Sequence, residues 1–216
     1  IGGGSLQVSF GYSDIDETTS ARVGNSVDIN QNTASASNDQ SVNVAAGNDL
    51  FMRTVLGAIA AGSKLTTSPA ADVLIVSMDT SAAIGANSRV RAKRDVNVQA
   101  YNEEDVIGVS VSIAGTIGGT FAGAGAVVAY DLDNTTYASN GDGSTVDAEG
   151  NVIVFAEDRT DADIVAGGVG ASISLTGGGI GASISASLLD KDTQDWIGSA
   201  TVDALGNGTA IEFVDG

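Results

Sequence analysis

The fold is decided by the stretch Thr145-Val146-Asp147-Ala148-Glu149-Gly150-Asn151, which returns 56 residues later as Thr201-Val202-Asp203-Ala204-Leu205-Gly206-Asn207. The same offset carries residues 95–100 onto residues 151–156, and residues 41–46 form a further copy 54 residues upstream. Matches that share one register are not expected from a biased composition alone. A period of this length indicates stacked structural repeats.

The repeated segments have the pattern of β-strands. Apolar and small polar residues alternate with period 2 in several of them, at residues 109–113, 151–156, 171–175 and 183–188. Such alternation is typical of a strand with one buried face. We therefore expect the Val, Ile and Leu side chains to face inward and the intervening serines to face outward. Glycine-rich steps at residues 140–143 and 177–179 predict turns.

The composition indicates an interior of small side chains. The 216 residues include 29 Gly, one Pro and only 5% aromatic residues, although 43% are hydrophobic. Together with the long period, this predicts an all-β protein, a β-solenoid similar to a parallel β-helix and built of ~56-residue repeats. With about 20 residues per rung and roughly 4.8 Å between rungs, each repeat would hold two to three rungs of a rod on the order of 50 Å long. A stacked β-hairpin or β-sandwich array is the alternative.

The repeats cover the whole chain. We expect a single array cut from a longer protein, with approximate repeats at residues 1–44, 45–98, 99–154 and 155–216. Residues 107–130 are nearly uncharged and match a membrane helix in length. Their glycines and alternating serines favour a strand-turn-strand unit instead, so no membrane span is expected.

Charge and missing residue types exclude several function classes. The net charge is -18, with 27 acidic and 9 basic residues, which argues against binding to nucleic acid or to anionic membranes. The absence of Cys excludes disulfides and thiolate metal sites. The absence of His removes the commonest general base and the commonest metal ligand.

One pattern resembles a known family. The arrangement Val-x-Ala-x-x-x-Val-x-Val-x-Ala stands at residues 90–100 and again at residues 146–156. It is similar to the repeat region of large filamentous bacterial adhesins, including leukotoxin-like and filamentous-haemagglutinin-like exoproteins. The resemblance implies parallel β-helices that are exported across the outer membrane and are secreted or held at the bacterial cell surface. It implies no binding residue, and the second copy departs from the first in its basic residues.

Pairs of carboxylates one residue apart are candidate calcium ligands. On a strand, residues i and i+2 point the same way, so two carboxylates converge, as Ca²⁺ requires of oxygen ligands. The candidate residues are Asp14, Asp16, Asp131, Asp133, Asp190 and Asp192. Residues 157–163 form a second acidic cluster, expected in a loop. The competing interpretation is a solvated acidic face that protects strand edges. No cofactor other than calcium is expected.

Two further features bear on function. Paired carboxylates also serve glycoside hydrolysis, so a carbohydrate-binding or polysaccharide-cleaving β-helix is the alternative function. The missing His and the single Trp disfavour catalysis, and we expect no enzymatic activity. The basic run Arg89, Arg91, Lys93 and Arg94 could bind an anionic glycan or pair with residues 103–105.

The resemblance and the composition together predict a structural or adhesive rod segment of a bacterial fibre. Such a segment would mediate attachment, or would build a matrix or filament by repetition. Its expected partners are neighbouring repeats or copies of itself, with surface glycans or receptors on host or other cells as further candidates.

Overall fold

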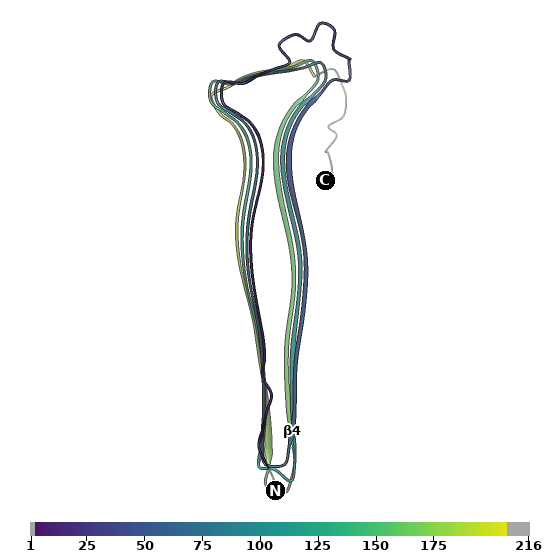
Figure 1. Ribbon diagram of the computed structural model, residues 1–216, viewed down its shortest axis with the longest axis vertical. Helices are drawn as coiled ribbons and strands as arrows, with labels where there is room; N and C mark the ends of the chain where they lie inside the picture. The colour runs from purple at the N-terminus through teal and green to yellow at the C-terminus, as the bar shows by residue number, and fades with distance from the viewer. Residues whose placement is uncertain (1–2, 207–216) are drawn as a thin grey trace.

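The computed structural model describes residues 3–206 and shows an all-β solenoid of parallel strands (Figure 1). The described residues form three sheets. Sheet 1 contains β1 (Ser5–Leu6), β2 (Ser9–Val23), β5 (Leu65–Ile84), β8 (Phe121–Asn140) and β11 (Gly178–Ile197). Sheet 2 contains β4 (Val42–Gly62), β7 (Val96–Ile117) and β10 (Val152–Ile173). Sheet 3 contains the short strands β3 (Asp28–Ile29), β6 (Arg89–Ala92), β9 (Thr145–Ala148) and β12 (Thr201–Ala204).

Each repeat makes one coil of the solenoid. Val96 pairs with Val152, and Leu65 pairs with Phe121, so register partners lie 56 residues apart. One coil consists of a long strand of sheet 1, a short strand of sheet 3 and a long strand of sheet 2. The expectation of two to three rungs per repeat is wrong, because the strands from β5 to β11 in the two long sheets have 20–22 residues each. All the strand pairs are parallel, which excludes the hairpin array.

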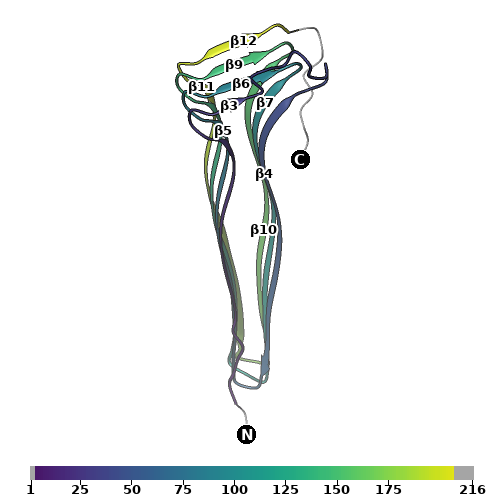
Figure 2. The ribbon, with the colours of Figure 1, turned by 45° about the horizontal axis from the view of Figure 1, so that its top comes forward.

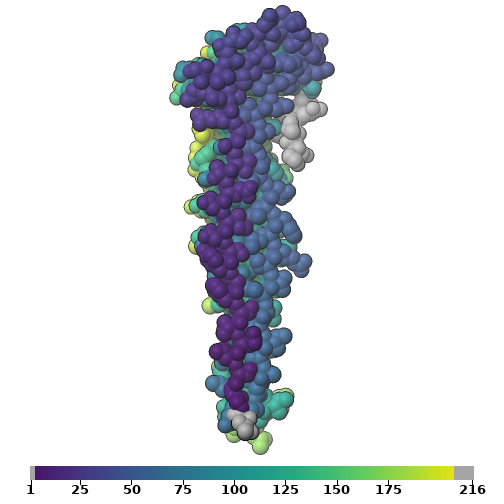
Figure 3. All heavy atoms as spheres, viewed as in Figure 1, coloured from purple at the N-terminus to yellow at the C-terminus, as the bar shows by residue number. Residues whose placement is uncertain are grey.

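The molecule is a flat blade rather than a rod along the stack. Strands of about 20 residues extend over roughly 65 Å, whereas four coils spaced about 4.8 Å apart occupy roughly 15–20 Å. Viewed down the shortest axis, the strands of successive coils overlie one another (Figure 1). Sheet 3 closes one end, here called the head, and the β7–β8 turn lies at the other end, the tip (Figure 2). The first coil covers one face, with β2 beside β4 (Figure 3).

Equivalent turns lead into sheet 3 in successive coils. Ser26, Asn87 and Gly143 all have positive φ, of 57°, 56° and 69°. The backbone N–H of Asn87 donates to the carbonyl of Asp142, and that of Gly143 donates to the carbonyl of Ser199, both at 2.9 Å. The hydrogen-bond ladder therefore continues through the corner from coil to coil. The predicted turn at residues 140–143 is confirmed.

The core near the head has the inward-facing aliphatic residues that the alternation predicted. Val98, Val90 and Val146 are fully buried there, and Val152, Val154 and Ala156 pack against the same cluster. A second cluster at mid-blade contains larger side chains, including Leu74 and Met78. Towards the tip, the buried apolar side chains shrink to Ala114, Ala122 and Ala124.

The tip reverses the predicted faces. Ser110 and Ser112 are fully buried, whereas Val111 and Ile113 are 38% and 41% exposed. The isoleucines and leucines of residues 171–175 and 183–188 are likewise exposed. The prediction that aliphatic residues face inward is therefore wrong in this half of the blade.

The cause is the short distance between sheets 1 and 2 at the tip. A Cβ on Gly170 would lie 2.6 Å from the carbonyl oxygen of Ala122 and would also overlap the carbonyl of Ile180. Only Gly, Ala, Ser and Thr fit into this space, and inward hydroxyls find partners there. Thr116 Oγ1 donates to Ser172 Oγ at 2.9 Å, for example.

Residues 107–130 form the end of β7, the turn at the tip and the first half of β8, as the glycine pattern predicted. Among residues 3–206, the structure contains no helix with the length and hydropathy needed to cross a membrane.

Candidate functional site: the exposed end of the coil stack

Sheet 1 extends one strand further than sheet 2. Each strand of sheet 2 packs between two strands of sheet 1, so β7 contacts β5 and β8, and β10 contacts β8 and β11. Within residues 3–206, no strand of sheet 2 follows β10, and the inward face of β11 is covered on one side only. Every residue of β11 except Lys191 is consequently exposed. The last coil presents both unpaired backbone groups and a cross-section of the interior.

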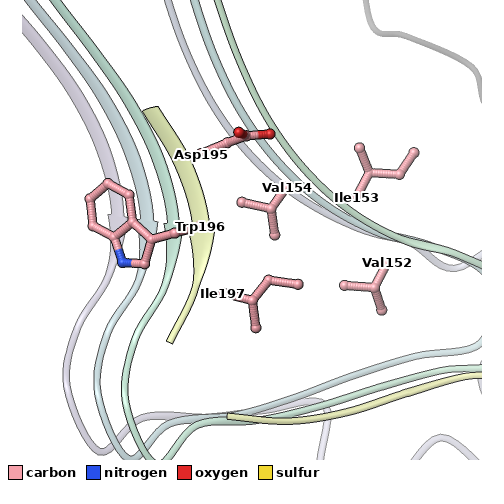
Figure 4. Close-up of a pocket in the computed structure, with 6 residues that line it drawn as sticks. All are labelled: Val152, Ile153, Val154, Asp195, Trp196 and Ile197. Atoms are coloured by element: carbon pink, nitrogen blue, oxygen red, sulfur yellow. The ribbon is translucent and has the colours of Figure 1, made fainter. Parts of the chain in front are cut away.

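A hollow of about 510 Å³ lies at this end, near the head. Its lining comes from β10 and β11, with Val152, Ile153, Val154, Asp195, Trp196 and Ile197. Val152, Val154 and Ile197 lie on one side of the β11 ribbon, and the Trp196 indole lies on the other (Figure 4). The hollow is thus the open end of the aliphatic core, which a further strand of sheet 2 would cover.

The Trp196 ring packs on the outer face of sheet 1. Its centroid lies 5.8 Å from that of Tyr137 in a T-shaped arrangement. The Tyr137 hydroxyl donates to Asp192 Oδ2 at 2.7 Å, and the Gln194 amide donates to Asp192 Oδ1 at 2.6 Å. These two hydrogen bonds, the first the stronger, lower the pKa of Asp192 below its usual value.

The six predicted calcium ligands all lie on the outer face of sheet 1. Asp133 and Asp190 are register partners on neighbouring strands. Ser77 separates Asp16 from Asp133, and Ile75 separates Asp14 from Asp131, so these carboxylates are two strands apart. Within the described part of the chain, no three acidic side chains are grouped as a metal site. Calcium binding remains a prediction, now centred on Asp133 and Asp190.

The acidic cluster at residues 157–163 lies in strand β10, not in the predicted loop. Its members point to both faces. Asp161 and Asp163 are exposed on the outer face of sheet 2, whereas the Asp158 side chain points inward and is only 1% exposed. Lys191 reaches Asp158 from sheet 1, with its Nζ 2.7 Å from Asp158 Oδ1.

Asp158 belongs to a buried polar layer that sequence reasoning missed. Asn48, Asn102 and Asp158 occupy one register position on β4, β7 and β10. Glu104, which is 1% exposed, accepts hydrogen bonds from Asn102 at 3.5 Å and from Thr160 at 3.3 Å. A recurring polar residue in the inward phase of each repeat was the available signal. Because each side chain finds a partner in the neighbouring coil, the layer favours one stacking register.

The basic run also bonds between coils. Arg89 lies 3.5 Å from Asp28, Arg91 lies 3.2 Å from Asp147, and Lys93 pairs with Glu149. The predicted pairing with residues 103–105 is wrong, because the partners are register neighbours in and beside sheet 3. These pairs are half-exposed, so each contributes at most about 1 kcal/mol, but together they align successive coils.

A buried carboxylate marks the boundary between the aliphatic core and the tip. Asp72 is 2% exposed, and its Oδ2 accepts hydrogen bonds from Thr54 and from the Tyr130 hydroxyl, the latter at 3.0 Å. Burial raises the pKa of Tyr130 to about 12, and the neighbouring Asp72 adds to this effect. Gly108 makes room for the ring, because a Cβ there would overlap the Tyr130 hydroxyl.

The comparisons with known proteins add no relative to this description: no family model, no curated protein and no solved structure matches the chain.

Proposed function

We propose that the chain is a structural or adhesive segment of a secreted or cell-surface bacterial fibre that grows by addition of coils. The observation that carries the proposal is the interchangeability of the coils. The partners in sheets 1, 2 and 3 keep a 56-residue offset across the middle of the molecule. The exposed edge at β11 has the shape of the surfaces on which the earlier coils stack.

The blade shape fits this role. Each added coil lengthens the stack by about 4.8 Å and adds strands of roughly 65 Å at its sides. Many coils would make a wide ribbon with a large lateral surface, and such a ribbon extends a distal binding region or builds a matrix. An unpaired strand edge accepts a further strand readily, so a neighbouring repeat or another copy is the expected partner at each end.

Duplication of one coil tests the proposal. Residues 96–151 make up β7, β8, β9 and their turns, so a second copy inserted after residue 151 keeps every register. We expect a folded protein that melts at a higher temperature, because each interface between coils adds stability. Small-angle scattering should show a thickness increased by about 4.8 Å.

The matched control duplicates residues 96–150 only. The loss of one residue shifts the inserted strands by one position and turns each side chain to the opposite face. This variant should melt below the wild type. Equal melting temperatures for the two insertions would show that coils are not interchangeable units.

The role as a spacer is tested separately with polysaccharides. A glycan array and a polysaccharide-lyase assay on the 216-residue chain should show neither saturable binding nor turnover. Turnover would replace the structural role with the carbohydrate-cleaving alternative. Saturable binding would assign recognition to these coils themselves rather than to a distal region.

A further inference from the structure

The outer face of sheet 2 carries a regular aliphatic surface on its tip half. Its side chains form rows across the three strands, for example Val55–Val109–Val165 and Ile59–Ile113–Val169. They are highly exposed, 72% for Ile59 and 57% for Val169. We call this surface the aliphatic face; it comprises Val55, Ile59, Val109, Val111, Ile113, Ile117, Val165, Val169 and Ile173.

The aliphatic face is sharply separated from the charged half of the same sheet. The last charged residues before the tip are Arg53 in β4, Asp105 in β7 and Asp163 in β10. Beyond them, none of the three strands carries a charge. An uninterrupted apolar surface of this kind is a hallmark of an interaction site, since isolated apolar side chains are common but large contiguous patches are not.

The size of the surface suits a protein partner. Ten residues of each strand at about 3.3 Å per residue, on three strands about 4.8 Å apart, make a patch of roughly 480 Å². Two such patches face to face remove about 1,000 Å² from water, the lower bound for a specific interface. Each additional coil would enlarge the contact.

The strand edges favour protein over lipid as the occupant. Within the described residues, β4 and β10 each have one edge without a strand neighbour, and these edges run along the whole aliphatic face. In hydrocarbon, every unpaired backbone group costs several kcal/mol, so lipid would solvate the face only at a large penalty. A second protein sheet covers the side chains and leaves the edges in water.

We propose that two copies of this chain pack through their aliphatic faces, tip over tip, with their heads pointing in opposite directions. Flat sheets of Val and Ile interdigitate well at about 10 Å, and an isologous contact needs only one kind of surface. The head half of the same face carries six carboxylates against two arginines: Asp49, Glu103, Asp105, Glu157, Asp161 and Asp163, with Arg53 and Arg159. The opposed orientation keeps these acidic halves apart. The contact is lateral and does not depend on the growth of the stack at its ends.

Sedimentation velocity over a range of protein concentrations tests the contact. We expect the wild type to form a dimer. The double substitution Ile113→Lys and Val169→Lys changes register partners at the centre of the face and should weaken dimerisation at least 100-fold. The matched control, Val127→Lys with Ile184→Lys, changes exposed register partners on the outer face of sheet 1 and should leave the dimer intact. Thermal melting of both variants checks that they fold.

Single cysteines test the orientation, because the chain has none of its own. Val111→Cys lies at the centre of the face and should form a disulfide-linked dimer under oxidation. Ile117→Cys lies at the tip and should not, because in opposed copies it faces the other end of the patch. Efficient cross-linking through Ile117→Cys would overturn the opposed orientation.

Three results would overturn the proposal as a whole. The first is a wild type that stays monomeric at all concentrations. The second is a dimer that survives Ile113→Lys with Val169→Lys, which would assign the association to strand edges. The third is binding to phosphatidylcholine vesicles that the same variant abolishes, which would assign the face to lipid. None of these results decides the coil-duplication experiment.

Discussion

Gly170→Ala is expected to destabilise the protein although it adds a single methyl group. Gly170 lies on the inner face of β10, and the new Cβ would sit 2.6 Å from the Ala122 carbonyl oxygen. An ordinary contact needs about 3.5 Å, so the two sheets must separate locally by close to 1 Å. A gap of this size forfeits about a quarter to a half of the dispersion attraction between the facing side chains. We therefore expect a loss of about 2 kcal/mol, within the range for overpacked cores.

Gly167→Ala is the matched control on the same strand. Gly167 lies on the outer face, and a Cβ there meets no atom within 4 Å. We expect it to be neutral or to stabilise by about 0.5 kcal/mol, because alanine restricts the unfolded chain more than glycine does. Thermal melting followed by circular dichroism should separate the two variants by roughly 4–8 °C. Equal melting temperatures would refute the close approach of the sheets and, with it, the reason for the reversed faces at the tip.

Three further predictions concern the titratable groups. Lys191→Met leaves the buried Asp158 carboxylate without its cation and should cost about 3 kcal/mol in urea unfolding, whereas adding Asp158→Leu should recover part of the loss; a double variant weaker than the single one would contradict this. Because folding raises the pKa of Tyr130 from 10.0 to about 12, its contribution is complete below pH 10 and is lost as the pH rises through 12. Tyr130→Phe should remove the last tyrosine step in an absorbance titration and flatten the fall in stability above pH 10; an unchanged titration curve would contradict the assignment. Calcium should raise the melting temperature through Asp133 and Asp190, and Asp133→Asn should abolish the shift; a wild type that melts alike with chelator and with calcium would remove the prediction.

Sequence reasoning reached the architecture because its signals are local or periodic. The 56-residue offset and the period-2 alternation predicted a parallel β-solenoid, and glycine predicted the turn that ends at Gly143. The rung length was wrong because a period tells how often the chain returns to one place, and not how many corners it makes on the way. The pairing of carboxylates one residue apart followed from strand geometry, but only the register brings Asp133 beside Asp190.

The inside and the outside of the tip could not be assigned from the alternation. Residues 109–113 offer one aliphatic and one serine face, and hydrophobicity alone places the aliphatic face inside. What decides the matter is the distance between two sheets, which depends on Gly170 and the facing carbonyls of Ala122 and Ile180. Those residues are far apart in sequence, so no local pattern reports their proximity.

The 56-residue offset between neighbouring strands also determines how the chain must fold. Almost every backbone partner is a whole coil away, so the first coil must close long loops before any contact rewards the lost entropy. Once one coil exists, its edge is a template, and each later strand needs only to align with a surface already in place. We therefore expect slow nucleation followed by rapid extension in one direction along the chain.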